Sequence, residues 1–539
     1  MNHDFVDSLD RRYQQLNAQM EPMLDLLQEI AEYFQPDRAN FRDTNRTGEE
    51  GRENIFDSTP EDALDQFSSQ LLSLLTNPSL KWFLMDVNGL ETGDLSDESK
   101  TFLDGAHKKM LAKFNDEETN FYTAVFEFYK DVVGFGSSPF LVEEDERSGV
   151  RFSCALLSEI RFAENKRKNV DTVARKWCPS AREISQMFDK YSEKVAKALE
   201  ENPDEKFEIV HFVYPGIEYK GSYKLDDKEF ASVYYERETK FILEEGGFYE
   251  NPYLVTRFSK RSGEVLGRGL GAKALPEARV LNEMGRSMLI AGENQAQPTT
   301  LLPDDGFIGG FSNQGGALNY YKSGSGSGIK DKVMTLDSNA DLNALQNLVA
   351  DRRDSIRKIF LNDKIKQVDG PRKSVPEVQA IMNEQYNVLG PVVGRFQADF
   401  LGPLIKRVFG IMLRGGEFGQ PPEELAELDI KIEYVSPISR AQKQVESEGF
   451  SQAINYLAPI SEVDPAVFRH FDFDFVARDT QQLFGFPLKY LKTDQQVEEE
   501  DQAAAQRAQE DQAKQDQSEE LGLEEQAATV DGMRAEQEQ

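Results

Sequence analysis

The sequence of 539 residues contains few cysteines and few histidines. Its two cysteines, Cys154 and Cys178, cannot build a disulfide framework and lie in no Cys-x-x-Cys motif, so we expect a reducing compartment. Its four histidines stand far apart in the sequence. A zinc site needs several nitrogen or sulfur ligands close together. The sequence therefore predicts no metal site.

Long apolar runs are also missing. No stretch approaches the roughly 18 uncharged apolar residues that a helix needs to cross a bilayer. The first residues include Asp4, Asp7 and Asp10 and lack the apolar core of a signal peptide. We therefore expect a soluble protein that does not follow the usual secretory route and has no membrane partner.

Basic side chains are outnumbered, because 62 Lys and Arg stand against 95 Asp and Glu for a net charge of -33. This balance excludes a protein that coats duplex DNA by bulk electrostatic attraction, which requires many phosphates to be neutralised. The apolar fraction of 39% and the aromatic fraction of 10% exclude a mostly disordered chain. The length allows three or four domains of about 150 residues each.

Motifs of catalysis are absent as well. Residues 267–273, Gly-Arg-Gly-Leu-Gly-Ala-Lys, depart from a phosphate-binding loop because Ala272 replaces the second glycine and Ala274 the hydroxyl residue. The pair Asp472 and Asp474 is expected by chance in so acidic a chain. There is no Gly-x-Ser-x-Gly and no His-Glu-x-x-His motif. We predict no catalytic residue and no cofactor, and interpret the glycines at 267–271 as a turn and domain hinge before a helix.

The first half mixes helical and strand patterns. Apolar residues from Val6 to Phe34 recur at spacings of three and four, and Pro22 is expected to kink or restart that helix. Ser180 and Glu183 form a predicted capping box at the start of a later helix. Further helices are predicted over 60–75 and from residue 120 to 134, and short segments at 150–155, 207–214, 232–236 and 240–244 predict strands. The pattern predicts an α+β domain.

The middle of the chain predicts two helices around an insertion. Residues 276–294 form one helix with Pro276 as its first residue, and 338–361 form the other. Residues 295–336 are rich in glycine and serine, which favours turns and flexible loop. The loop 362–375 is a local positive segment that contains Lys364, Lys366, Arg372 and Lys373.

The last part begins with a long apolar helix from Pro376 to about Leu413. Two Gly-Pro pairs are expected to bend it, because each proline removes a backbone hydrogen bond. These pairs are Gly390-Pro391 and Gly402-Pro403. Residues 428–435 predict a strand and 437–490 a helical region, whereas the tail from 494 has 15 acidic and three basic residues and is predicted to be disordered.

Several stretches, taken in order, resemble the head-to-tail connector (portal) proteins of short-tailed, T7-like bacteriophages. The resemblance extends to about Tyr490, and no single stretch carries it alone. The stretches are Asn77–Phe83, Asn120–Tyr122 before Gly134–Gly136, Asn169–Arg175, Gly267–Gly269 with Ala274–Pro276, Leu389–Pro391, and Tyr434–Pro437 with Ala441 and Gln442.

The resemblance implies an α+β portal fold assembled into a ring of twelve copies at one vertex of the capsid. Double-stranded DNA would be packaged and ejected through its channel. The implied parts are a wing at 1–272 and 376–435, stem helices at 273–294 and 338–361, a clip at 295–337, a tunnel loop at 362–375, a helical crown at 436–493 and the acidic tail at 494–539.

The resemblance also implies partners and site residues. The partners are further copies of the chain, double-stranded DNA without sequence readout, the major capsid and scaffolding proteins, the large terminase subunit and a tail adaptor. The virion would be assembled in the host cytoplasm. The tunnel-loop cations Lys364, Lys366, Arg372 and Lys373 would contact DNA phosphates, and Tyr320 and Tyr321 would anchor a clip interface.

Other interpretations stay open from the residues. The loop cations pair with acids of a neighbouring subunit or are simply solvated, and the two tyrosines pack locally. A separate alternative concerns the whole chain: a minor capsid or internal virion protein, or a DNA-packaging enzyme such as an ATPase or nuclease subunit.

Overall fold

The computed structural model describes residues 2–42, 52–87, 96–303, 316–321, 334–336, 342–362, 389–422, 430–434 and 454–459, with isolated positions between and beyond them. The chain forms two compact units. The first comprises Met1–Trp82, Met110–Glu417 and Ser436–Ala441, and the second comprises Phe83–Lys109, Phe418–Val435 and Gln442–Gln539. Helices combine with largely antiparallel sheets, so the predicted α+β class is confirmed.

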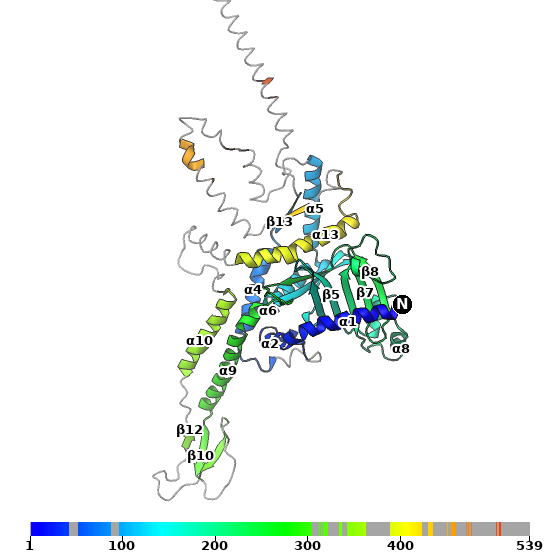
Figure 1. The fold of residues 1–539 in the computed structure, drawn as a ribbon. Helices are drawn as coiled ribbons and strands as arrows, with labels where there is room; N and C mark the ends of the chain where they lie inside the picture. Colours follow the sequence, from blue (N-terminus) through cyan, green and yellow to red (C-terminus); the bar gives the residue numbers. More distant parts are fainter. Residues whose placement is uncertain are drawn as a thin grey trace, which may run out of the picture. The chain divides into compact units, whose positions relative to one another are not determined.

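The first unit contains most of the described elements (Figure 1). Its helices are α1 (Asn2–Met20), α2 (Leu24–Phe34), α4 (Thr59–Leu75), α6 (Phe121–Phe135), α7 (Ala181–Met187), α8 (Glu193–Glu201), α9 (Leu270–Ala296), α10 (Leu342–Ile359) and α13 (Gly402–Arg414). Its sheets are β3-β2-β9 (Gly149–Cys154, Ser137–Asp145, Tyr253–Arg257), β4-β5-β6-β7-β8 (Ile160–Glu164, Val170–Trp177, Ile209–Pro215, Phe230–Glu236, Ile242–Phe248) and β11-β10-β12 (Leu318–Tyr321, Thr299–Pro303, Met334–Leu336).

The helical pattern that opens the chain is divided where proline predicts it. Helix α1 ends at Met20, a 3₁₀ turn covers Glu21–Met23, and α2 begins at Leu24. Pro22 lacks the N–H that a continuous α-helix would use, so the helix restarts after it. The prediction of a restart at this position is confirmed.

The five-stranded sheet has helices on both faces. Successive side chains of a strand point to opposite faces. On β6, Val210 and Phe212 therefore meet Leu9 and Tyr13 of α1, whereas Ile209 faces α7 and α8. The predicted capping box is present at the start of α7, where Ser180 and Glu183 bond each other's backbone N–H groups.

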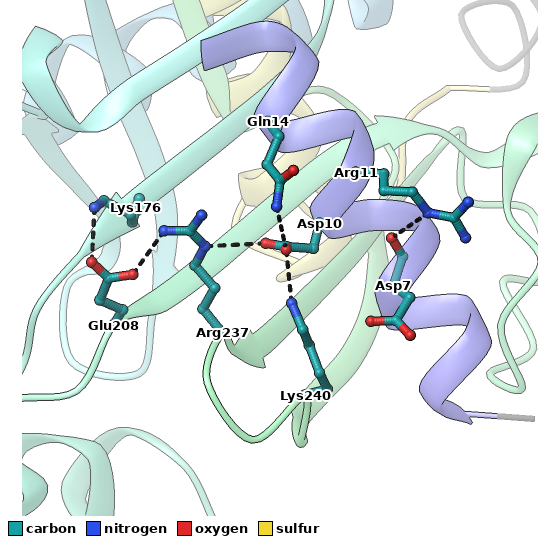
Figure 2. A network of polar contacts seen from close by, with 8 residues as sticks. All are labelled: Asp7, Asp10, Arg11, Gln14, Lys176, Glu208, Arg237 and Lys240. Carbon is teal, nitrogen blue, oxygen red and sulfur yellow. Dashed lines mark hydrogen bonds and ion pairs between the residues drawn. The ribbon is translucent and has the colours of Figure 1, made fainter. Parts of the chain in front are cut away.

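A polar network fastens α1 to this sheet (Figure 2). Its centre is Asp10, whose carboxylate lies 3.2 Å from Arg237 Nε and 2.7 Å from Lys240 Nζ. Burial alone would raise the pKa of Asp10, but Lys240 and Arg237 outweigh it, so the pKa of Asp10 is lowered. The network continues from Arg237 to Glu208 and on to Lys176 of β5. Asp10 is therefore bound in its charged form.

An aromatic core joins α6 to the sheet β3-β2-β9 and to a later part of the chain. Phe121 of α6 packs edge-on against Phe152 of β3 at 5.0 Å between ring centroids. Phe128 stacks on Phe400 at 4.2 Å, and Phe140 of β2 meets the same Phe400 ring at 5.1 Å. Phe400 lies in a π-helical turn, η6 (Gln397–Leu401), so this turn is part of the core.

Glycines allow two backbone segments to approach each other closely. A Cβ added at Gly136, Gly267, Gly269 or Gly271 would lie closer than 3.0 Å to backbone atoms of the opposite segment. Gly136 also has φ +92°, a conformation that other residues rarely adopt. Both sides of 267–271 belong to the same compact unit. The glycines thus allow the segments 133–136 and 267–271 to pack directly against each other. Their interpretation as a domain hinge is wrong.

Helix α9 begins earlier than the sequence predicts. It starts at Leu270 after the N-cap Gly269, and Pro276 lies inside it, so the prediction of Pro276 as its first residue is wrong. Leu270, Ala272, Ala274 and Leu275 favour a helix, and contact of Gly271 with Gly134 fixes the first turn. The helix-favouring residues and this contact together stabilise the helix by more than the one backbone hydrogen bond that Pro276 removes.

The insertion between α9 and α10 contains a sheet that the composition did not predict. Strand β10 pairs in parallel with β11 and antiparallel with β12. The glycine-rich stretches hid strands of only three to five residues, such as Thr299–Pro303, because the pattern of a short strand is weak. The expectation of turns and loop alone over 295–336 is corrected.

The second unit contains the two-stranded antiparallel sheet of β1 (Phe83–Val87) and β13 (Ile430–Tyr434), which confirms the strand predicted at 428–435. Helix α5 (Asp97–Asn115) begins in this unit, where His107 packs edge-on against Phe83 at 5.0 Å. Residues 454–459 are helical. Nearly all other positions of the predicted helical region at 437–490, and nearly all of the acidic tail, lie outside the described residues.

Candidate functional site

Helices α9 and α10 lie side by side (Figure 1). Arg352 Nη1 of α10 lies 2.9 Å from Glu277 Oε2 of α9. Asn282 of α9 accepts a hydrogen bond from the Phe56 N–H and donates one to the Asn54 carbonyl, at 2.8 and 2.9 Å. The buried positions of α9 end at Asn282. The last 14 residues of this 27-residue helix, about 21 Å at 1.5 Å per residue, therefore extend past the part that is packed.

The three-stranded sheet at the far end of α9 carries the two predicted interface tyrosines. Tyr320 faces Leu302 in the β10-β11 register and is 47% exposed, whereas Tyr321 faces Pro303 and is half-buried. Leu318, two residues earlier on the same face as Tyr320, is also exposed. Tyr320 and Leu318 thus form one exposed apolar strip, and Tyr321 points to the other face.

The four cations of the predicted tunnel loop, Lys364, Lys366, Arg372 and Lys373, lie outside the described residues. Before them, Asn362 is buried and its Nδ2 donates to the Ala63 carbonyl at 3.2 Å. The chain is described again from Leu389, which is also buried.

The helix that follows runs through both Gly-Pro pairs. Residues 389–396, which include Gly390 and Pro391, are α-helical, and the π-helical turn η6 comes directly before Gly402 and Pro403 at the start of α13. Bends at these two pairs stay a prediction. The turn contributes Phe400 to the core, a role that the sequence pattern did not indicate.

Arg407 fastens α13 to the sheet β3-β2-β9. It is 1% exposed, and its guanidinium donates to the carbonyls of Val142 and Glu250, both at 2.8 Å. Burial lowers the pKa of Arg407 to about 10, and the Glu250 carboxylate 3.6 Å away partly opposes that effect. Arg407 therefore stays charged at neutral pH. The neighbouring Arg414 binds the same carboxylate at 2.8 and 2.9 Å.

The arrangement closest to a catalytic one is buried. His211 lies between Tyr253 Oη, 2.8 Å from Nδ1, and Ser232 Oγ, 2.9 Å from Nε2. All three side chains are buried, so a substrate has no access to Ser232. Burial lowers the pKa of His211 well below its usual value, with a smaller effect from Arg175. The ring is neutral and serves to connect β6, β7 and β9.

A second buried polar cluster contains Asp131, Arg38 and Cys154. Arg38 Nη1 lies 3.0 Å from Asp131 Oδ2, and Cys154 Sγ lies 3.7 Å from the same oxygen. Burial raises the pKa of Asp131 to about 6 despite the attraction of Arg38. Burial, followed by the Asp131 charge, raises the pKa of the Cys154 thiol, which makes it a poor nucleophile. This cluster connects α6 to the segment after α2.

Within the described part of the chain, no group of three or more His, Cys, Asp or Glu side chains is arranged to hold a metal ion. Among the same residues, no helix combines the length and the apolarity of a membrane span. The features that distinguish the described part of the chain are therefore its surfaces: paired helices that extend past the core, and an exposed apolar strip on a small sheet.

Comparison with known proteins agrees with these features. The family model of the bacteriophage head to tail connecting protein matches residues 6–491. The chain belongs to this family. It is 26% identical over 500 residues to the "Probable portal protein" of Bordetella phage BPP-1, which covers 90% of this chain and 88% of that protein. It is also 26% identical over 493 residues to the "Portal protein" of Salmonella phage epsilon15, covering 87% and 86%.

As a head to tail connecting protein, the chain has the portal role in a bacteriophage that the sequence predicted. The family is one of structural connectors. Sequence reasoning missed the mutual packing of the two glycine segments. Both segments stand out in the sequence as closely spaced glycines, but nothing in one sequence indicates that they meet.

Proposed function

We propose that the chain assembles into a ring at the portal vertex of the capsid and that double-stranded DNA enters and leaves through the axial channel. The observation that carries this proposal is the family match over residues 6–491 together with two portal relatives aligned over most of their length. The expected number of subunits is twelve. A net charge of -33 per subunit suits a channel that repels the DNA backbone and lets it slide.

We assign each part of this portal to a segment of the chain. Helices α9 and α10 form the stem, which starts at Leu270, and the sheet β11-β10-β12 forms the clip. The five-stranded sheet with α1, α7 and α8 belongs to the wing, and the helix through Gly390 and Gly402 crosses toward the tunnel loop. Residues 436–493 form the crown, and 494–539 the acidic tail.

The tunnel loop supplies the direct contact with DNA. Lys364, Lys366, Arg372 and Lys373 repeat around the ring axis and bind phosphates without reading the base sequence. Asn362, which lies just before the first of these cations, is buried and bonded to the Ala63 carbonyl. We expect glutamine at all four positions to leave rings intact but to lower the amount of DNA that particles package and retain.

The matched control changes four exposed lysines elsewhere, at Lys197, Lys206, Lys220 and Lys224, to glutamine. Packaging in a phage complemented with this control should equal that of the unmodified chain. Equal packaging and retention by the tunnel-loop variant would remove the loop from the mechanism while leaving the portal assignment in place.

The clip provides the docking surface for the terminase large subunit during packaging and for the tail adaptor afterwards. The exposed strip of Leu318 and Tyr320 supplies the apolar and aromatic contact that such interfaces favour. Deletion of residues 306–328 should spare the ring and abolish binding of both partners. Unimpaired binding by a ring with this deletion would contradict the clip assignment. The major capsid and scaffolding proteins surround the ring during assembly in the host cytoplasm.

A further inference from the structure

The five-stranded sheet has two open edges with opposite chemistry. The strand order is β4-β5-β6-β7-β8, and among the described strands none pairs beyond β4 or β8. With about 4.8 Å between neighbouring strands, the edges lie about 19 Å apart on opposite sides of one sheet. A surface on each edge can therefore be in contact with a different neighbour at the same time.

The β8 edge is acidic and carries protruding apolar side chains. A groove of about 810 Å³ lies along Ile242–Glu245. Around it, Met187 is 53% exposed, Tyr223 39% and Phe241 36%. Asp189 and Glu244 line the same groove and make no ion pair with any described residue. Exposed apolar side chains gathered around one groove are typical of an interaction surface.

The charges in this groove remain uncompensated within the subunit. Burial raises the pKa of Glu244, and the like charge of Asp189 raises it further, so the two carboxylates are close enough to repel each other. Of the two lysines in the lining, Lys240 is bound to Asp10 at 2.7 Å. Only Lys190 is left to oppose the acids among the described lining residues. A cationic partner would relieve this repulsion.

The β4 edge has the complementary features. A groove of about 510 Å³ lies beside it and is mostly apolar, with Leu16, Met20, Phe162 and Val265 in its lining. Two charged side chains also line this groove. Arg161 is bound to Asn17 and to backbone carbonyls, and Glu264 is paired with Arg268 at 2.8 Å, so both charges are already compensated. This groove can receive apolar side chains from a partner.

A basic surface continues from this groove on both segments that form it. The turn after β4 carries the exposed Lys166, Arg167 and Lys168, and the segment after β9 carries the exposed Arg261. None of these four makes an ion pair with a described residue. The nearby carboxylate of Glu164 is already bound by Arg257 and Lys260. Four exposed cations therefore stand free beside an apolar groove, in a chain of net charge -33.

We propose that the β8 edge of one subunit docks on the β4 edge of the next, with Met187 and Phe241 entering the apolar groove and Asp189 and Glu244 facing the cations. The partner that docks at each edge is a second copy of this chain, because the acidic edge and the complementary basic edge both belong to one chain and lie on opposite sides of one sheet. Duplex DNA would use the cations but not an apolar groove. A contact between two different surfaces repeats head to tail and closes into a ring when its rotation allows.

This inference rests on the proposed ring and names the surfaces that build it. The test uses two charge-reversal variants of the full chain. The basic-edge variant reverses all four cations, with Lys166→Glu, Arg167→Glu, Lys168→Glu and Arg261→Glu, and the acidic-edge variant carries Asp189→Lys and Glu244→Lys. Each alone places like charges on both edges and should form no rings in electron micrographs or native mass spectra. A one-to-one mixture should restore rings with equal numbers of the two variants.

Matched controls change the same number of charges at other exposed positions. The basic-edge control carries Lys197→Glu, Lys206→Glu, Lys220→Glu and Lys224→Glu, and the acidic-edge control carries Glu117→Lys and Glu118→Lys. Both controls should form rings as the unmodified chain does. Rings from either edge variant alone, or no rings from the mixture, would overturn the proposal. If the basic-edge variant keeps its rings but binds duplex DNA less tightly, this surface serves DNA and the proposal is wrong.

A cross-link provides a readout that does not depend on the charge variants. With Cys178→Ser as background, Met187→Cys and Val265→Cys in one chain should form disulfides between subunits and a ladder of multimers in denaturing gels. Assembled rings that give no ladder would contradict docking of these edges. If the unmodified chain forms no rings at any concentration, the failure lies with the proposed function and not with the choice of edges.

Discussion

Substitution of Gly136 by alanine tests the close approach of the two glycine segments. Two costs are expected. The left-handed backbone at φ +92° costs an alanine about 1 kcal/mol. The added Cβ would also lie closer than 3.0 Å to the backbone of Arg268 and Gly269, and overpacking of this kind costs about 1 to 3 kcal/mol. We expect a loss of about 2 to 4 kcal/mol in the free energy of unfolding.

Two controls separate these costs. Gly263 has φ +88° but no atom within 4 Å of an added Cβ, so Gly263→Ala should show only the conformational cost of about 1 kcal/mol. Gly267 has no positive φ but would clash with the Gly136 carbonyl, so Gly267→Ala should show the contact cost alone. Midpoints of urea unfolding, followed by tryptophan fluorescence, measure all three. Equal losses for Gly136→Ala and Gly263→Ala would refute the reasoning.

Three further predictions concern buried charges and the clip. Arg407→Met should cost about 3 to 5 kcal/mol because it leaves the Val142 and Glu250 carbonyls without donors, and a loss no larger than that caused by Arg414→Met, at an exposed position, would contradict it. Asp131 has a folded pKa of about 6 against an ordinary 3.8, so its contribution is greatest below pH 3.8 and is lost as pH rises toward 6. The upper bound is about 3 kcal/mol, and Asp131→Asn should remove this slope from pH-dependent unfolding curves. An unchanged pH dependence of the free energy of unfolding would show that a group other than Asp131 causes it. Tyr320→Ala should weaken clip binding in a pull-down more than Tyr321→Ala, and the reverse order would count against the exposed strip.

Asp10 shows the opposite sign and marks what the sequence leaves undetermined. Its pKa is lowered, so its contribution is present above the ordinary value of 3.8 and is lost as pH falls through the folded pKa. Asp10 and Asp131 are both aspartates in helices, and nothing local distinguishes them. The difference comes from Lys240 and Arg237, which the fold brings to Asp10 from far along the chain.

Local signals in the sequence predicted much of the fold correctly. Pro22, the Ser180 capping box and the apolar spacing of α4, α6 and α10 act within a few residues, so one sequence is enough to interpret them. The start of α9 was misplaced because Pro276 is a strong local signal, whereas the contact of Gly271 with Gly134 depends on tertiary structure.

The candidate surfaces divide in the same way. The tunnel-loop cations lie close to one another in the sequence, and so do the two clip tyrosines, so both groups were identified from the sequence. The structure describes only the tyrosines. The basic and acidic edges of the five-stranded sheet were not identified. Lys166 and Arg261 lie on two different segments of the chain. The Glu164 carboxylate of the first segment connects them by binding Arg257 and Lys260 of the second.

Electron microscopy of the purified full chain, with native mass spectrometry, tests the central claim most directly. We expect rings of about twelve subunits, as closed head-to-tail contacts allow, with a central channel wide enough for duplex DNA. A monomer or dimer at every concentration, or a closed assembly without an axial channel, would contradict the portal account.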